Sequence, residues 1–121
     1  MEFQKVDTTG TEGKWRYLEC STTVGGSVGS QKLMGCQVCG NTNYRFVHTL
    51  EYPKDLGRIR GTYENRIWVG VECAALLIDG DPDIPRLAEA ETRRKERWRI
   101  HYGNYGECRT TVKDLIEKDK L

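Results

Sequence analysis

The pattern of hydrophobic and polar positions predicts short strands in the first two thirds of the chain. Three stretches rich in aromatic and β-branched residues, 15–18, 44–50 and 66–71, are typical of strands. The apolar stretch 73–78, stopped by Asp79 and a glycine, predicts a short buried helix. The last two strands and this helix are therefore expected to form a β-hairpin followed by a helix.

The last third of the chain is expected to be mainly helical. Asp83 is a candidate N-cap with a proline in the first turn, and the helix should run to about Tyr102, where a Gly-Asn-Tyr-Gly stretch breaks it. Residues 110–118 have weak apolar periodicity, so this segment could be a terminal helix, or a strand over 108–112. Together these elements predict an α+β fold.

Composition separates three zones within one compact domain. Residues 1–32 hold the first strand and a Gly/Ser loop over 25–30, residues 33–81 hold the hairpin and short helix, and residues 82–121 hold the long helix and the C-terminal segment. Of the 121 residues 37% are hydrophobic and 31% are charged, which is lean for a self-sufficient core. We therefore expect the fold to rely on disulfides or on a metal.

The five cysteines favour a metal. The N-terminus lacks the basic and apolar regions of a secretory signal, and the apolar runs are too short to span a bilayer. We therefore expect a cytoplasmic protein with reduced thiols and no membrane partner, in which a Cys-x-x-Cys pair is metal-binding or redox-active. The odd number of cysteines also disfavours a complete disulfide framework.

The Cys36-Gln-Val-Cys39-Gly40 stretch has the form of a zinc knuckle. A strand is expected after it, whereas a redox-active pair would be followed by a helix. Cys73 stands at the predicted start of the short helix, where the helix dipole stabilises a thiolate. A knuckle, a hairpin and a helix that returns to the metal form a treble-clef-like zinc domain. We therefore predict one Zn²⁺ ion with Cys36, Cys39 and Cys73 among its ligands.

The fourth ligand must come from elsewhere in the chain. His48 is favoured because it lies on the first strand of the hairpin, close to the knuckle in sequence; the alternatives are Cys20, Cys108 and His101. Four protein ligands would close the site to water, so the zinc is interpreted as structural.

An enzymatic role is not predicted. The chain has no His-Glu-x-x-His motif, and its histidine and cysteines occur in the wrong order for a nucleobase deaminase. Glu51 and Glu72, the acidic residues nearest to the predicted ligands in sequence, are interpreted as solvated side chains. A zinc hydrolase is therefore the least favoured hypothesis.

The long helix carries the candidate nucleic-acid contacts. Arginine suits phosphates and tryptophan suits bases. The candidates are Arg93, Arg94, Lys95, Arg97, Trp98 and Arg99. The alternative is a solvated helix face supported by pairs such as Glu89–Arg93, and the formal net charge of only +1 predicts no dominant electrostatic partner for the whole chain. The combination of arginines and a tryptophan on one helix nevertheless makes binding of DNA or RNA the leading functional hypothesis.

Residues 34–104 resemble a family of small, uncharacterised bacterial and phage-borne zinc-binding proteins. The resemblance lies in CQVCGNTNYRFVHTLEYP, RIWVGVECAALLIDGD and the Arg-rich RRKERWRIHYGN. It implies metal binding and supports His48 as a ligand. The chain departs from the family in a longer hairpin loop and in Val71, where relatives often carry another cysteine. A protein-interaction role, as an accessory factor of a phage or mobile element, is the alternative function.

Overall fold

The computed structural model describes residues 5–22, 36–40, 46–102 and 109–119. It confirms the α+β class, with a four-stranded antiparallel sheet in the order β3-β2-β1-β4. The strands are β1 (Arg16–Thr22), β2 (Phe46–Glu51), β3 (Arg66–Val69) and β4 (Arg109–Thr111). The helices are α2 (Val71–Leu77), α3 (Ile84–Tyr102) and α4 (Val112–Asp119), with a 3-10 turn η1 (Lys54–Leu56). The Gly/Ser loop expected over 25–30 lies outside the described residues.

Local chemistry explains where the later elements begin and end. α3 begins directly after Asp83 and ends at Tyr102, as the sequence predicts. Both alternatives for the C-terminal segment occur in succession, because β4 leads straight into α4. At their junction the backbone N–H of Thr111 donates to Asp114 Oδ2 (3.0 Å), while the N–H of Asp114 approaches Thr111 Oγ1 (3.4 Å). This reciprocal capping stops the strand and starts the helix.

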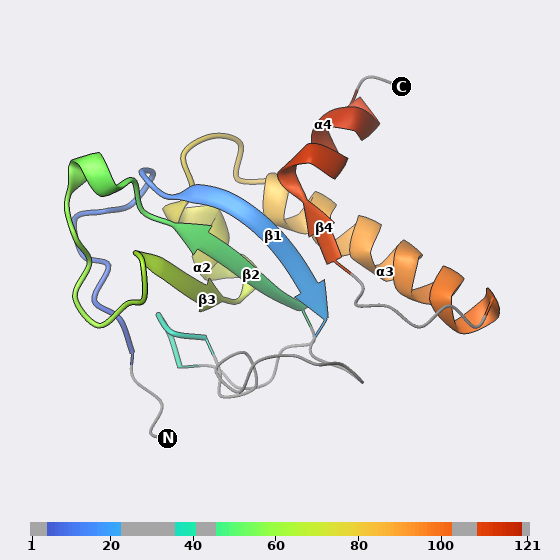
Figure 1. The fold of residues 1–121 in the computed structure, drawn as a ribbon, viewed down its shortest axis with the longest axis horizontal. Coiled ribbons are helices and arrows are strands. Elements are labelled where there is room, and N and C mark those ends of the chain that lie inside the picture. Colours follow the sequence, from blue (N-terminus) through green and yellow to red (C-terminus); the bar gives the residue numbers. More distant parts are fainter. Residues whose placement is uncertain (1–4, 23–35, 41–45, 103–108, 120–121) are drawn as a thin grey trace.

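The sheet and two helices enclose the core. Helices α2 and α3 lie behind the sheet in Figure 1, with α2 packed on β2 and α3 on β1 and β4. The fully buried Trp15 joins the start of β1 to the end of α2. Its backbone N–H donates to the carbonyl of Leu77 (3.0 Å), and the backbone N–H of Asp79 donates to the carbonyl of Trp15 (2.8 Å). Its ring also packs on Tyr52, with 5.2 Å between centroids.

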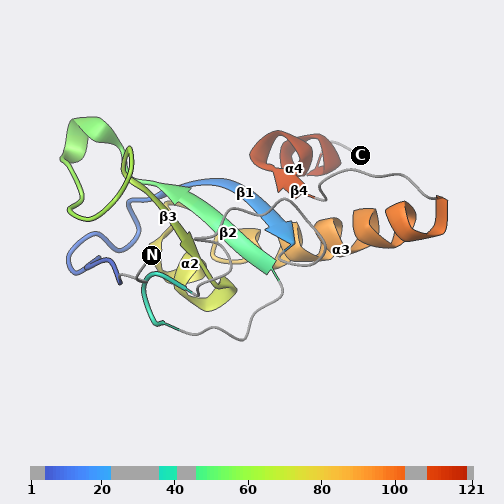
Figure 2. The same ribbon diagram turned by 60° about the horizontal axis from the view of Figure 1, so that its bottom comes forward.

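The loop between β2 and β3 is held by one buried side chain, Asn65. Its Oδ1 accepts the N–H of Ile59 (2.9 Å), and its Nδ2 donates to the carbonyls of Gly57 (2.8 Å) and Tyr52 (3.3 Å). The loop projects from one end of the sheet, whereas α3 runs toward the other end (Figures 1 and 2). No helix in the described part of the chain is long and apolar enough to cross a membrane.

Candidate metal centre

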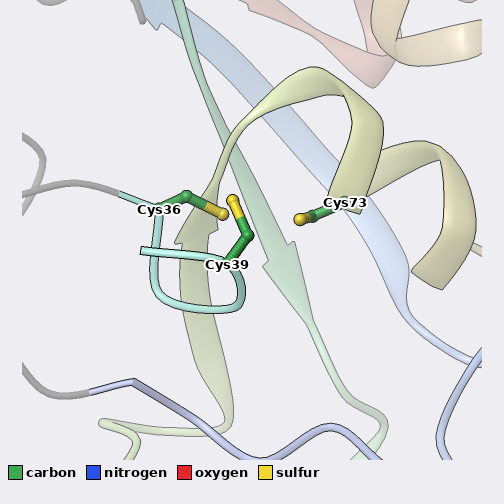
Figure 3. A group of neighbouring side chains, drawn as sticks. All are labelled: Cys36, Cys39 and Cys73. Atoms are coloured by element: carbon green, nitrogen blue, oxygen red, sulfur yellow. The ribbon is translucent and has the colours of Figure 1, made fainter. Parts of the chain in front are cut away.

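The structure brings together three of the four predicted zinc ligands. The sulfur atoms of Cys36, Cys39 and Cys73 all lie within 4.8 Å of one another. Figure 3 shows them pointing toward a common centre, two from the turn at residues 36–40 and one from the first turn of α2. Cys36 is buried, Cys73 is half-buried and Cys39 is exposed, so the group lies at the edge of the core.

The turn between the first two cysteines has the form expected of a metal-binding knuckle. The N–H of Gly40 donates to the carbonyl of Cys36 (2.8 Å), which closes the turn. Gly40 has a φ of 80°, in the left-handed region that glycine enters without steric cost. The glycine that follows the Cys-x-x-Cys pair therefore fixes the direction in which the two thiols face.

Gln37, between the two cysteines, ties the knuckle to strand β3. Its N–H donates to the carbonyl of Trp68 (3.1 Å), and its side-chain Oε1 accepts the N–H of Trp68 (2.8 Å). The N–H of Val6 donates to the Gln37 carbonyl from the other side. Because β3 leads directly into α2, these bonds set the position of the knuckle relative to Cys73. No motif in the sequence indicates this role of Gln37.

The electrostatics of the group favour a thiolate. A hydrogen bond from the Cys73 thiol, together with backbone N–H groups including that of Cys39, lowers the pKa of Cys36 to about 5, although burial opposes this shift. The same bond raises the pKa of Cys73. The pair thus loses its first proton easily and its second with difficulty, as expected for neighbouring thiols. A bound cation would favour the deprotonated form of every thiol.

His48 lies apart from the three thiols. Its side chain is fully buried, with Nδ1 2.9 Å from Tyr17 Oη and Nε2 2.7 Å from Glu89 Oε2. Both ring nitrogens are therefore engaged, and in this arrangement the imidazole offers neither to a metal at the cysteine group. His48 instead links β1, β2 and α3.

Cys20, the first alternative to His48, also lies outside the group. It is fully buried and stands directly opposite His48 in the pairing of β1 with β2. Burial raises the pKa of the Cys20 thiol to about 12, so it is a protonated core side chain. The side chains of the other two alternatives, His101 and Cys108, lie outside the described residues.

The two glutamates near the predicted ligands have ordinary surroundings. Glu51 forms ion pairs with Arg16 (3.2 Å) and Arg66 (3.1 Å) on neighbouring strands. Glu72 is an exposed residue in the first turn of α2, ahead of Cys73.

The candidate nucleic-acid residues of α3 fall into two sets. Arg93, Arg94, Arg97 and Trp98 are exposed, whereas Lys95 is half-buried and binds Asp114 Oδ2 (3.0 Å) and the carbonyl of Arg109 (3.1 Å). The guanidinium of Arg93 lies 5.3 Å from the centre of the Phe46 ring, and that of Arg94 pairs with Glu91. Lys95 therefore holds α3 to the C-terminal segment. The side chain of Arg99 lies outside the described residues.

Comparison with known proteins adds no assignment. The chain matches no protein-family model, and no similar protein was found among curated proteins or solved structures. The structure defines a small α+β domain with a three-cysteine group that could hold a metal ion. The family resemblance drawn from the sequence motifs stays a prediction.

Proposed function

We propose that this chain is a small metal-stabilised domain that holds one zinc ion at Cys36, Cys39 and Cys73. The observation that carries the proposal is the convergence of three thiols within 4.8 Å. Zinc–sulfur bonds of about 2.3 Å in a tetrahedral site place sulfur atoms about 3.8 Å apart, so only a small contraction would complete the geometry. The knuckle supplies two ligands and the start of α2, which follows the β2–β3 hairpin, supplies the third, in the order of a treble-clef-like domain.

We propose that the fourth coordination position is not filled by His48, the ligand that the sequence favours. To bind the metal, His48 would have to give up at least one of its hydrogen bonds with Tyr17 and Glu89, and loss of the buried bond to Tyr17 would cost about 1–3 kcal/mol. His101, Cys108 and a water molecule are the remaining candidates. Water is compatible with the exposure of Cys39. A zinc-bound water would also support the hydrolase hypothesis.

The proposed role of the ion is to stabilise the fold. The knuckle is attached to the sheet mainly through Gln37, and α2 has only seven residues with no side-chain N-cap. An isolated helix of this length is marginal in water. Zinc would cross-link both elements, and its binding free energy would become folding free energy.

Metal stoichiometry tests the proposal. The protein is refolded with zinc, dialysed and measured by elemental analysis as wild type, Cys39→Ser, Cys73→Ser and Cys20→Ser. We expect one zinc per chain in the wild type, with loss or strong weakening in the first two variants. Cys20→Ser is the matched control, because it removes a buried thiol outside the group. A metal-free wild type, or stoichiometric zinc in Cys73→Ser, contradicts the proposal.

Nucleic-acid binding is the second candidate function, favoured by the outward face of α3. Arg94, Arg97 and Trp98 are all exposed and stand at spacings of three and four residues, which places them on one side of the helix. Two guanidinium groups beside an indole can contact phosphates and a base.

A charge-reversal pair tests this face. Arg94→Glu with Arg97→Glu should abolish binding of a short DNA or RNA in a gel-shift titration, while the far-UV spectrum and zinc content stay unchanged. The matched control is Lys14→Glu with Lys113→Glu, which makes the same change in net charge at two exposed lysines outside α3. Equal binding by the two double variants contradicts the proposal, and a partner captured only as protein would favour the accessory-factor role.

A further inference from the structure

A second candidate site lies in the loop between β2 and β3, which neither the metal group nor α3 uses. The loop encloses a recess of about 500 Å³. This volume is within the usual range for small-molecule sites, about 300–1,000 Å³. The residues lining it are Lys54, Gly57, Arg58, Thr62, Tyr63, Glu64 and Asn65.

The recess is built by hydrogen bonds rather than by loose chain. Besides the three bonds of Asn65, the hydroxyl of Thr62 donates to the carbonyl of Ile59 (2.7 Å). Glu64 and Asn65 have φ values of 52° and 58°, in the left-handed region that costs non-glycine residues about 1 kcal/mol or more. The Asn65 bonds compensate this strain, so the shape of the recess exists before any ligand binds.

The lining presents groups that suit one class of ligand. Among the described residues neither Lys54 nor Arg58 has an ion-pair partner, and both are exposed. Tyr63 is 74% exposed, so the packing of the core does not account for this aromatic residue. Two unpaired cations attract a phosphate, and an exposed aromatic ring offers a face to a base.

We propose that this recess binds a nucleotide, with its phosphate at Lys54 and Arg58 and its base on the ring of Tyr63. Glu64, the carboxylate in the lining, can accept hydrogen bonds from ribose hydroxyls, as acidic residues do in other nucleotide sites. The site is independent of the proposed contacts of α3, because the loop and the far end of α3 lie at opposite ends of the molecule (Figures 1 and 2).

Calorimetric titrations of the zinc-loaded full chain test the proposal, with AMP, adenosine, inorganic phosphate and a single-stranded RNA pentamer as probes. AMP should bind more tightly than adenosine or phosphate, because only AMP engages both the cations and the ring. Arg58→Ala removes a phosphate contact and Tyr63→Ala removes the stacking surface for the base, so each should weaken AMP binding about tenfold. Tyr63→Phe should bind as the wild type does, since it keeps the ring face.

Two controls and the pentamer decide the outcome. Lys113→Ala and Ile116→Ala remove an exposed cation and an exposed apolar side chain on α4, and should leave AMP affinity unchanged. If the RNA pentamer binds more tightly than AMP, with the same dependence on Tyr63, the ligand of the recess is a nucleotide within a strand. If AMP and the pentamer bind with equal affinity, the ligand is a free nucleotide. No saturable binding of either probe, or AMP binding insensitive to Arg58→Ala and Tyr63→Ala, overturns the proposal.

Discussion

The sharpest prediction concerns His48, which the sequence assigns to the metal and the structure assigns to the core. His48→Ala should destabilise the fold while leaving one zinc per folded chain. The reason is that both ring nitrogens bind protein groups, Tyr17 Oη on β1 and Glu89 Oε2 on α3. The substitution therefore breaks one connection between the sheet and α3 and leaves the three thiols in place.

The magnitude follows from what the substitution leaves behind. Tyr17 is buried, so a hydroxyl without its partner costs about 1–3 kcal/mol. Glu89 is partly exposed and water can replace its bond to His48, so the loss of that bond adds little. The space of a fully buried imidazole adds a cavity cost of about 2 kcal/mol. We expect a total of about 3–5 kcal/mol, a large part of the 5–15 kcal/mol that stabilises a typical domain.

Urea unfolding measures the stability loss, and two readouts on the folded protein measure the metal. Elemental analysis gives the stoichiometry, and the absorption spectrum of the Co²⁺-substituted protein reports the ligand set. Tyr17→Phe is the matched variant: it leaves one ring nitrogen unpaired and should cost about 1–2 kcal/mol without changing the spectrum. A folded His48→Ala protein that loses zinc, or whose cobalt spectrum changes, would refute the reasoning and restore His48 as the fourth ligand.

Three further predictions follow from the same structure. Asn65→Ala should lower the free energy of unfolding in urea by about 2–4 kcal/mol, because it removes three hydrogen bonds at a position with left-handed backbone. Asn65→Gly should recover only the energy of the backbone strain, so equal losses in the two variants would contradict this explanation. Backbone and side-chain hydrogen bonds, including one from Lys95, lower the pKa of Asp114 below its ordinary 3.8. A lowered folded-state pKa contributes stability that is present above about pH 4 and lost as the pH falls further. Asp114→Ala should therefore lower the free energy of unfolding by about 0.5–1 kcal/mol at pH 7, after allowance for solvent screening, and by almost nothing near pH 2. In the metal-free native protein at pH 8, mass spectrometry after iodoacetamide treatment should find Cys39 alkylated and Cys20 intact. Cys39 is exposed, whereas Cys20 is buried and its pKa is raised to about 12. Rapid labelling of Cys20 would contradict its place in the core.

Much of the element order could be read from the chain because local chemistry determines it. The N-cap candidate Asp83 and the nearby Pro85 predict the start of α3 to within a residue, and the glycine after Cys39 gives the knuckle its turn. For the C-terminal segment the local sequence does not distinguish a strand from a helix, since its weak apolar periodicity fits both. The structure contains both, because the capping bonds between Thr111 and Asp114 end one and begin the other.

The place of His48 was decided only by tertiary structure. Its sequence neighbourhood, three cysteines and a hairpin, is that of a ligand, but β2 turns its side chain toward the core, where α3 presents Glu89. A register shift in β1 between Tyr17 and Glu19 brings Tyr17 within reach of the same imidazole. Pairing register and the contact of a distant helix are not encoded in local spacing, so sequence reasoning could not find this network.

The sequence by itself determined which residues can approach a metal, because Cys36 and Cys39 are joined by one turn and Cys73 stands at a helix start. It also determined the α+β class, through the periods of its hydrophobic pattern. Tertiary structure decided which polar side chains are buried and hydrogen-bonded in the core and which stay accessible at the surface. The physical reason is that burial and hydrogen-bond partners depend on contacts between segments far apart in the chain, such as His48 with Glu89, and these exist only once the sheet and α3 have packed together.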